Sequence, residues 1–307
     1  MIVVMTGATS GIGLKAAERL LSLPDMQLIV GARDPDRAPA ILRRKAQLIT
    51  LDLADLGSVA SFAHEARKLG KINVLALNAG VQNVKDTRTA DGFEATFAVN
   101  HLAHFHLVQA LQGDLRPSGR VVITASGTHD PAEKTGMPGP RHADAQLLAY
   151  PETDPDRDAK PVTAGRRAYT ASKLCNVLMA RELARRLAVS DPGIAVIAFD
   201  PAFTPGTGLA RNYPGPVGAI FRHVLPWTTR PSESASTPAR SGEYLANLIL
   251  SGAYAKARGD YYAVKGTTLR HQPPSLLAQD PAVAGALWND SERLIASARS
   301  FNQAGAA

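Results

Sequence analysis

The sequence predicts a single-domain α/β fold, in which helices cover both faces of a doubly wound parallel sheet of about seven strands. The main observation is that short, nearly continuous apolar runs alternate with amphipathic stretches along the first half of the chain. Such runs are typical of parallel strands that are buried on both faces. The second observation is size: 307 residues with a hydrophobic fraction of 45% are enough for one large core.

The predicted strands and helices follow in order along the chain. The strands are expected at residues 1–5, 27–31, 46–51, 72–77, 120–124, 194–199 and 260–264. The helices are expected at residues 12–22, 36–44, 55–69, 92–112 and 168–189. In a sheet of this kind, ligands bind beyond the carboxyl ends of the strands.

Composition and charge restrict the classes of function. The net charge is +7, but the basic residues are scattered and no nucleic-acid-binding motif accompanies them, so we expect no nucleic-acid partner. The one cysteine, Cys175, cannot form a disulfide within the chain, which fits a reducing compartment. No signal peptide is visible, and no apolar run approaches the roughly 18 residues of a membrane span. We therefore expect a soluble, cytoplasmic protein without a transmembrane segment.

A glycine-rich turn follows the first predicted strand, in the sequence Thr6-Gly7-Ala8-Thr9-Ser10-Gly11-Ile12-Gly13. Glycines let the backbone turn tightly and approach a pyrophosphate, and the next helix presents free N–H groups and a positive dipole end to it. We therefore predict a Rossmann-type dinucleotide site, although this motif alone is equally consistent with a tight turn that binds nothing. The predicted contacts are those of Thr6, Gly7, Thr9, Ser10, Gly11, Ile12 and Gly13.

The end of the second predicted strand indicates which cofactor is bound. An acidic residue about 20 positions after the glycines would bind the ribose 2′-hydroxyl of NAD, but Ala32 stands there and Arg33 follows it. A guanidinium group pairs with a 2′-phosphate, so NADP(H) is favoured over NAD(H). We expect Asp34 to cap the next helix ahead of Pro35 instead of binding a ribose.

The next two strands end in further candidate cofactor residues. Asp52 and Leu53 follow the third strand, and Asn78-Ala79-Gly80 follows the fourth. An adenosine and its ribose would lie at this edge of the sheet. We predict that all five residues contact the cofactor, with a plain turn residue as the alternative for Asp52.

Tyr169 and Lys173 stand four positions apart on a predicted helix, which places them on one face. A free tyrosine has a pKa of about 10, and a nearby ammonium group lowers it. Tyr169 is therefore a candidate general acid for ketone reduction and general base for alcohol oxidation. Ser126, at the end of the fifth strand, can donate a hydrogen bond to the substrate oxygen, and Thr124 is its alternative.

These motifs together resemble those of a classical short-chain dehydrogenase/reductase over nearly the whole chain. The resemblance implies a catalytic tetrad of Asn100, Ser126, Tyr169 and Lys173. It implies that Asn100 holds a water that relays protons to Lys173, that Ser126 positions the carbonyl, and that Tyr169 transfers the proton. Lys173 would also bind the nicotinamide ribose. The matched residues are Thr6-Gly7, Gly11-Ile12-Gly13, Asp52, Asn78-Ala79-Gly80, Asn100, Ser126, Tyr169 and Lys173.

Three stretches of sequence resemble the branch that contains retinol dehydrogenases and light-dependent protochlorophyllide reductases. They are Asn-His-Leu-Ala-His-Phe (100–105), Tyr-Thr-Ala-Ser-Lys-Leu-Cys-Asn (169–176) and Ala-Leu-Trp-Asn-Asp-Ser-Glu-Arg-Leu (286–294). This resemblance implies a preference for NADP(H) and a long segment between the catalytic serine and tyrosine, which this chain also has.

The chain departs from the family pattern after the sixth strand. The family has Pro-Gly there, followed by a threonine that holds the nicotinamide carboxamide, whereas this chain has Pro201-Ala202. The cofactor contacts are expected from Pro201 and from either Thr204 or Thr207. Cys175 matches a cysteine of the light-driven reductases, but a buried small residue is the simpler interpretation.

No metal site is predicted. His101, His104 and His106 are spaced so that they do not share one helix face, and no second cluster of ligands accompanies them.

We expect one domain over residues 1–307, with a dinucleotide-binding core of 1–126 and 166–200 and a C-terminal segment of 252–307. Residues 127–165 and 201–231 are rich in proline and glycine, and we interpret them as excursions over the active-site mouth. The alternative for 127–165 is a disordered insertion.

The predicted activity is NADP(H)-dependent interconversion of an apolar aldehyde or ketone with an alcohol. The alternatives are a light-dependent protochlorophyllide-type reductase and a redox-silent NADP-binding sensor or scaffold. The expected partner is a small apolar substrate, and assembly into a homo-oligomer is left open.

Overall fold

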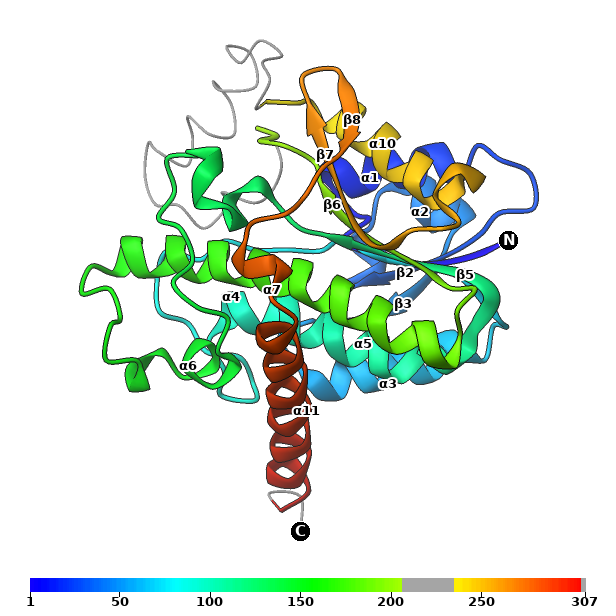
Figure 1. The fold of residues 1–307 in the computed structure, drawn as a ribbon. Coiled ribbons are helices and arrows are strands. Elements are labelled where there is room, and N and C mark those ends of the chain that lie inside the picture. The colour runs from blue at the N-terminus through cyan, green and yellow to red at the C-terminus, as the bar shows by residue number, and fades with distance from the viewer. Residues whose placement is uncertain (206–234, 305–307) are drawn as a thin grey trace.

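The computed structural model describes residues 1–205 and 235–304, which build one eight-stranded sheet between two layers of helices (Figure 1). The strand order is β3-β2-β1-β4-β5-β6-β7-β8, with β8 antiparallel to β7 and the other described pairs parallel. The predicted doubly wound fold is confirmed, and β8 is an addition to it. The strands are β1 (Ile2–Thr6), β2 (Gln27–Ala32), β3 (Gln47–Thr50), β4 (Ile72–Leu77), β5 (Leu115–Thr124), β6 (Ala195–Asp200), β7 (Arg258–Lys265) and β8 (Thr268–His271).

The strand order reverses between β1 and β4. The chain runs from β1 outward to β2 and β3, and then returns to β4 on the other side of β1. Thr6 therefore pairs with Gly31 of β2 on one side and with Leu77 of β4 on the other. A reversal of this kind opens a crevice at the carboxyl ends of the strands, where nucleotides bind in such folds.

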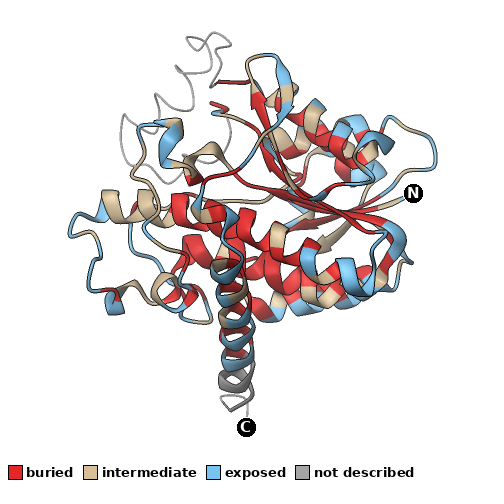
Figure 2. Ribbon diagram, viewed as in Figure 1, coloured by how far each residue is buried: buried red, intermediate tan, exposed pale blue. Residues whose placement is uncertain are grey.

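Each face of the sheet has its own layer of helices and its own apolar core (Figures 1 and 2). One layer contains α1 (Gly11–Leu20), α2 (Ala40–Lys45) and α10 (Pro238–Leu250). The other contains α3 (Leu56–Arg67), α5 (Ala103–Leu111) and α7 (Pro161–Ser190). The sheet between them is buried on both sides, which explains why its strands are nearly continuous apolar runs.

Three predicted helices differ from their expected form. The stretch 36–44 divides into a 3₁₀ turn (Pro35–Arg37) and the short helix α2, with extended backbone between them. The stretch 92–112 contains α4 (Ala95–Phe97), a π-helical turn (Ala98–Leu102) and α5. The helix expected at 168–189 begins earlier, at Pro161, because proline is favoured in the first helical turn and the polar residues after it face the surface.

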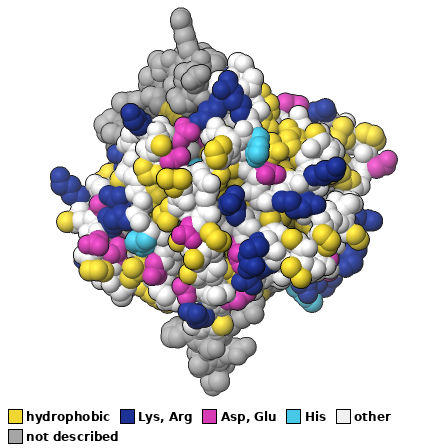
Figure 3. Space-filling view, in the orientation of Figure 1, with side chains coloured by type: hydrophobic (Ala, Val, Ile, Leu, Met, Phe, Trp, Pro, Cys, Tyr) yellow, Lys and Arg dark blue, Asp and Glu magenta, His cyan; other side chains and the backbone are white. Residues whose placement is uncertain are grey.

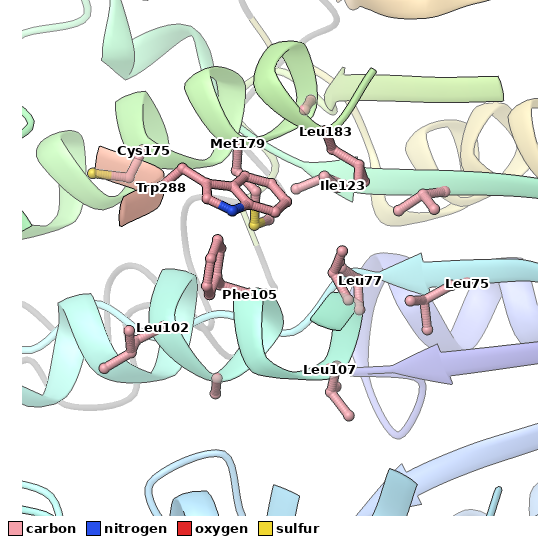
Figure 4. Close-up of a cluster of buried hydrophobic side chains, with 14 of the residues drawn as sticks. Leu75, Leu77, Leu102, Phe105, Leu107, Ile123, Cys175, Met179, Leu183 and Trp288 are labelled. Atoms are coloured by element: carbon pink, nitrogen blue, oxygen red, sulfur yellow. The ribbon is translucent and has the colours of Figure 1, made fainter. Parts of the chain in front are cut away.

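The C-terminal helix α11 (Pro281–Ala304) packs across α7, α3 and α6 (Ala145–Ala149). Its Trp288 lies between Phe105 of α5 and Met179 of α7 (Figure 4), with the Phe105 and Trp288 rings edge to face and 4.7 Å apart. The sequence predicted neither α10 nor α11. Within the described ranges, no helix combines the length and the apolar character needed to cross a membrane.

Residues 127–160 follow an irregular path with short helical turns and α6, and 161–165 belong to α7. Arg167 of α7 holds this segment through Asp158 at 2.6 Å. A cavity of about 240 Å³ lies between the segment and α7, and no tetrad residue lines it. The position of the 127–165 excursion relative to a substrate thus stays a prediction.

Candidate active site

The glycine turn fits tightly against the end of β4. Gly7 and Gly11 have φ angles of +66° and +55°, in the left-handed region that favours glycine. A Cβ on Gly7 would stand 2.6 Å from Cα of Ala79, and one on Gly13 would stand 2.0 Å from the carbonyl oxygen of Gly7. Any side chain at these two positions would therefore displace the backbone.

The N-terminus of α1 has the features of an anion site. Its first turn contains no acidic residue, and the exposed Ser10 makes no capping hydrogen bond with its side chain. The first N–H groups of a helix need an acceptor, and the helix dipole favours a negatively charged one. The geometry of this turn therefore fits a bound pyrophosphate.

Thr6 joins the glycine turn to the end of β4. Its buried hydroxyl oxygen accepts hydrogen bonds from the backbone N–H groups of Asn78 at 3.0 Å and Ala79 at 3.1 Å. The Asn78 side chain in turn donates to the carbonyl oxygen of Gly7 at 3.1 Å. Four of the predicted cofactor residues are therefore held together at the strand reversal.

His104 extends this network to the predicted catalytic asparagine. Because the Thr6 oxygen already accepts two hydrogen bonds, its hydrogen is directed at Nε2 of His104, 3.0 Å away. Nδ1–H then donates to the carbonyl oxygen of Asn100 at 3.0 Å. Burial lowers the pKa of His104 to about 4, so the ring is neutral. From the sequence, His104 was considered only as a metal ligand. Its position four residues after Asn100, on the same helix face, could have indicated the contact between them.

The Asn100 side chain ties the extension of β4 to α7. Its Oδ1 accepts from the N–H of Val81 at 2.7 Å. Its Nδ2 donates to the carbonyl oxygen of Val81 and to Oγ of Ser172, both at 2.9 Å. Ser172 directly precedes Lys173, so this contact fixes the face of α7 that carries Lys173 against the sheet.

Lys173 and Tyr169 lie side by side in the interior. Nζ of Lys173 is 5.6 Å from the centre of the Tyr169 ring and donates to the carbonyl oxygen of Thr124 at 3.2 Å. The same Nζ is 3.4 Å from the point where a Cβ on Gly80 would stand. Burial lowers the pKa of Lys173 to about 8, and the Asp200 carboxylate opposes this shift. The ammonium group is thus held close to the phenol and little hydrated.

Ser126 lies just beyond β5 and begins a 3₁₀ turn, where its Oγ accepts from the N–H of Thr128 at 3.3 Å. It is partly exposed, whereas the alternative, Thr124, is buried and donates its hydroxyl hydrogen to Oδ1 of Asn78 at 3.2 Å. This difference favours Ser126 as the group that meets a substrate.

Arg33 directly follows β2 and is exposed, and its side chain makes no hydrogen bond or ion pair within the described part of the chain. Asp34 accepts from the N–H of Arg37 at 3.3 Å, as expected of a cap. Asp52 accepts from the N–H of Ala54 at 3.0 Å and so shapes its own turn, while Leu53 is buried. The edge of the sheet where the adenosine was predicted to lie thus presents a guanidinium group.

The turn after β6 is the predicted contact of the nicotinamide. Ala202 has a φ of +60° in place of the family's glycine. The Thr204 hydroxyl is buried and donates within its own turn, to the carbonyl oxygens of Pro201 and Ala202. Thr207 lies outside the described residues, so the two threonines remain alternatives.

Cys175 and the other two histidines face the interior. Cys175 lies in the core cluster that includes Trp288 (Figure 4), and burial raises the pKa of its thiol. His101 contacts Ser291 of α11 at 3.1 Å, and His106 is buried. Among the residues that the structure describes, no three candidate ligands gather into a metal site.

The surface charge is mixed. Lys and Arg side chains are interspersed with Asp and Glu on the face shown in Figure 3. On this face, the described residues form no continuous basic stripe of the kind that tracks a nucleic-acid backbone.

Comparison with known proteins agrees with this geometry. The sequence profile of the family described as short chain dehydrogenase matches residues 1–136. A WW domain-containing oxidoreductase of Danio rerio is 33% identical, over 96% of this chain and 68% of its own length. A protochlorophyllide reductase of Avena sativa is 31% identical, over 96% of this chain and 99% of its own length.

Solved structures share the fold. A putative uncharacterized protein from Mycobacterium paratuberculosis superimposes with a TM-score of 0.68 and 28% identity, over 96% of this chain and 92% of its own. BdcA, solved in complex with NADPH, superimposes with a TM-score of 0.62 and 20% identity, over 89% of this chain and 96% of its own. At 20% identity, the similarity to BdcA shows a shared fold and nothing more.

Proposed function

The chain belongs to the short-chain dehydrogenase/reductase family, in the branch of the retinol dehydrogenases and protochlorophyllide reductases, and we propose that it interconverts an apolar aldehyde or ketone with its alcohol, using NADP(H). The observation that carries the proposal is the placement of Lys173 beside Tyr169, with Nζ 5.6 Å from the ring centre. Both residues lie where α7 meets the ends of β4 and β5.

The residues of the strand reversal fit a dinucleotide. The turn of Gly7, Gly11 and Gly13 leaves no room for a side chain at Gly7 or Gly13, and the first turn of α1 carries no acidic residue. Thr6, Asn78 and Ala79 brace that turn from β4. When bound, the nicotinamide cofactor supplies or accepts a hydride at the substrate carbon.

Arg33 supports NADP(H) as the cofactor. Its exposed guanidinium group would pair with a 2′-phosphate, whereas no carboxylate stands at the position that binds the 2′-hydroxyl of NAD. Two neighbours with the same fold, BdcA and a Burkholderia cenocepacia dehydrogenase, were solved with NADPH and NADP.

The chain's own residues handle the proton. In reduction, the Tyr169 hydroxyl gives its proton to the substrate oxygen as negative charge develops there, and in oxidation the phenolate takes the proton back. The buried ammonium group of Lys173 stabilises that phenolate. Ser126 donates a hydrogen bond to the same substrate oxygen, and Asn100 holds α7 in place through Ser172.

A light-dependent reductase of a tetrapyrrole double bond is the second candidate, because the Avena sativa relative matches over 99% of its length. Such an activity would appear only under illumination with pigment. The Cys175 thiol is buried, and burial raises its pKa. A direct role of this thiol in either reaction is therefore not expected.

The test is a screen of aldehydes and ketones with NADPH and NADH, run in the dark with the wild type, Tyr169→Phe and Tyr150→Phe. Tyr150 packs against Phe93 and serves as the matched control. We expect NADPH-dependent turnover in the wild type and in Tyr150→Phe, and a loss of about 10²- to 10⁴-fold in kcat/KM in Tyr169→Phe. Undiminished turnover in Tyr169→Phe would refute the proton-donor role, and faster turnover with NADH would refute the role of Arg33.

A further inference from the structure

We propose that Asp200 is a positioning residue of the active site, which fixes the Ser126–Gly127 peptide relative to the Pro201–Ala202 turn and provides the countercharge for Lys173. The inference deepens the proposed function and rests on it. It adds a residue that the catalytic tetrad does not include.

Asp200 ends β6 and is only 3% exposed. Its Oδ1 accepts from the N–H of Ala202 at 2.9 Å, and its Oδ2 accepts from the hydroxyl of Tyr261 at 3.1 Å. Burial raises the pKa of Asp200, and the hydrogen bonds from Ala202, Tyr261 and the N–H of Gly127 oppose this shift by stabilising the charged form. All three groups are donors, so the deprotonated carboxylate, which only accepts, satisfies them best.

Gly127 leaves room for this contact. A Cβ at Gly127 would stand 3.0 Å from Oδ2 of Asp200, so a side chain there would press on the carboxylate. The N–H of the peptide that follows the catalytic serine can therefore face Asp200 closely.

His129 holds the other polar group of that peptide. Its Nε2 accepts from the N–H of Ser275 at 3.1 Å, so the hydrogen of the neutral ring is on Nδ1, which donates to the carbonyl oxygen of Ser126 at 2.7 Å. The Tyr261 ring packs edge-on against His129, with centroids 5.0 Å apart. Tyr261 thus supports both side chains that hold the peptide, and this peptide sets the direction of Oγ of Ser126.

On the cofactor side, Asp200 stabilises an unusual turn. Ala202 has a φ of +60°, which alanine rarely adopts, and its N–H is bound to Oδ1 of Asp200. The Pro201–Ala202 turn is expected to face the nicotinamide. One carboxylate therefore connects the residue that meets the substrate with the turn that meets the cofactor.

Asp200 lies close to the contact that Lys173 makes with the sheet. Nζ of Lys173 donates to the carbonyl oxygen of Thr124, and Thr124 pairs with Phe199, the residue before Asp200. Other charged or titratable groups stand near Asp200. Lys265 of β7 is paired with Glu133 at 2.5 Å. The turns after β5 contribute Asp130, Glu133 and His129, whose ring is neutral. In the described part of the chain, no carboxylate forms an ion pair with Lys173 at contact distance. The Asp200 carboxylate raises the pKa of Lys173 against the effect of burial. Removing that charge favours loss of a proton from the coupled pair of Lys173 and Tyr169.

The test compares Asp200→Asn and Tyr261→Phe with Tyr262→Phe, a control at the next position of β7 whose ring contacts Tyr254 and His271. The full chain is assayed with NADPH and a carbonyl substrate found in the screen, and in the reverse direction across pH. Asp200→Asn should lose about 10- to 100-fold in kcat, because misplacement of reacting groups is costly. Its pH profile should shift to lower pH, while KM for NADPH changes much less than kcat. Tyr261→Phe should lose kcat by a smaller factor, and Tyr262→Phe should match the wild type.

Hydrogen–deuterium exchange provides a readout that does not depend on turnover. Asp200→Asn should speed exchange in peptides that contain the Gly127 and Ala202 amides, without changing exchange in β2. A kcat loss without the pH shift would indicate a merely structural role and overturn the proposal, as would wild-type values in Asp200→Asn. If Asp200→Asn does not fold, Tyr261→Phe decides: wild-type kcat and exchange overturn the proposal. If the wild type turns over no carbonyl, the proposed function is refuted instead. Hydrogen–deuterium exchange in Asp200→Asn then still shows whether Asp200 holds the peptides that contain the Gly127 and Ala202 amides.

Discussion

The ammonium group of Lys173 lies 5.6 Å from the centre of the Tyr169 ring, one helical turn away on α7. Both side chains are almost completely buried. An ammonium group in this position favours the phenolate that acid–base chemistry requires, but it has lost its hydration. Burial accordingly lowers the pKa of Lys173 to about 8. The residue that supports catalysis is therefore expected to destabilise the ligand-free fold.

Lys173→Met should make the ligand-free protein more stable at pH 7 while abolishing turnover. The pKa of Lys173 falls from 10.5 to about 8 on folding, so the folded state binds this proton less tightly than the unfolded state. The penalty is fully present below pH 8 and is relieved as the pH rises to 10.5. We expect a gain of about 1–3 kcal/mol in the free energy of unfolding at pH 7.

Urea unfolding at pH 7 and pH 10 measures this difference. The advantage of Lys173→Met should shrink at the higher pH, whereas Lys15→Met, at a half-exposed position on α1, should change stability little. A Lys173→Met protein that is less stable than the wild type at pH 7 contradicts the argument.

The sheet and the convergence of the glycine turn with the end of β4 were predictable because they depend on local pattern. The ends of β1 and β4 were placed within a residue, and parallel strands end at one edge, so Thr6, Gly7, Asn78 and Ala79 had to converge. β8, α10 and α11 were missed: residues 238–250 were assigned to no element, and within the C-terminal segment 252–307 only the strand at 260–264 was predicted. The early start of α7 was missed because Pro161 was attributed to the preceding loop.

The supporting residues of the site were not predictable from the sequence. His104 contacts Thr6 across 98 positions of sequence, and Asp200 meets Tyr261 from the neighbouring strand. An aspartate before a proline resembles an ordinary turn residue, and a histidine on a helix has no assigned face until the helix is packed. Such contacts depend on tertiary geometry, which spacing alone does not determine.

Arg33→Ala should raise KM for NADPH by about 10- to 100-fold and leave KM for NADH nearly unchanged, because a lost charge-assisted bond to a phosphate costs about 1.5–3 kcal/mol. Initial-rate kinetics with both cofactors measure the effect. Arg37→Ala is the matched control, since Arg37 is also exposed but is associated with Asp34. Equal effects of the two substitutions, or an equal loss with NADH, would exclude a specific phosphate contact.

Cys175→Ala should retain kcat within about twofold and lose about 1 kcal/mol of stability, because a small buried side chain is removed from the core. In the folded wild type, the thiol should not react with alkylating reagents at pH 8, since burial raises its pKa and blocks access. Mass spectrometry before and after urea denaturation measures the modification. Fast alkylation of the native protein, or a large loss of turnover in Cys175→Ala, would assign the thiol a chemical role.

Ala202→Gly should stabilise the protein by about 0.5–1 kcal/mol. Alanine at a φ of +60° suffers a contact between its Cβ and the backbone that costs about 1–2 kcal/mol, and glycine avoids it. Part of the gain, about 0.4–1 kcal/mol, is lost because glycine makes the unfolded chain more flexible.

Urea unfolding measures the difference in stability. Ala188→Gly, on the exposed side of α7, is the control and should lose about 0.5–1 kcal/mol. Since the N–H of residue 202 still reaches Asp200, KM for NADPH should stay within about twofold. A less stable Ala202→Gly protein would show that the methyl group makes favourable contacts that outweigh the backbone strain.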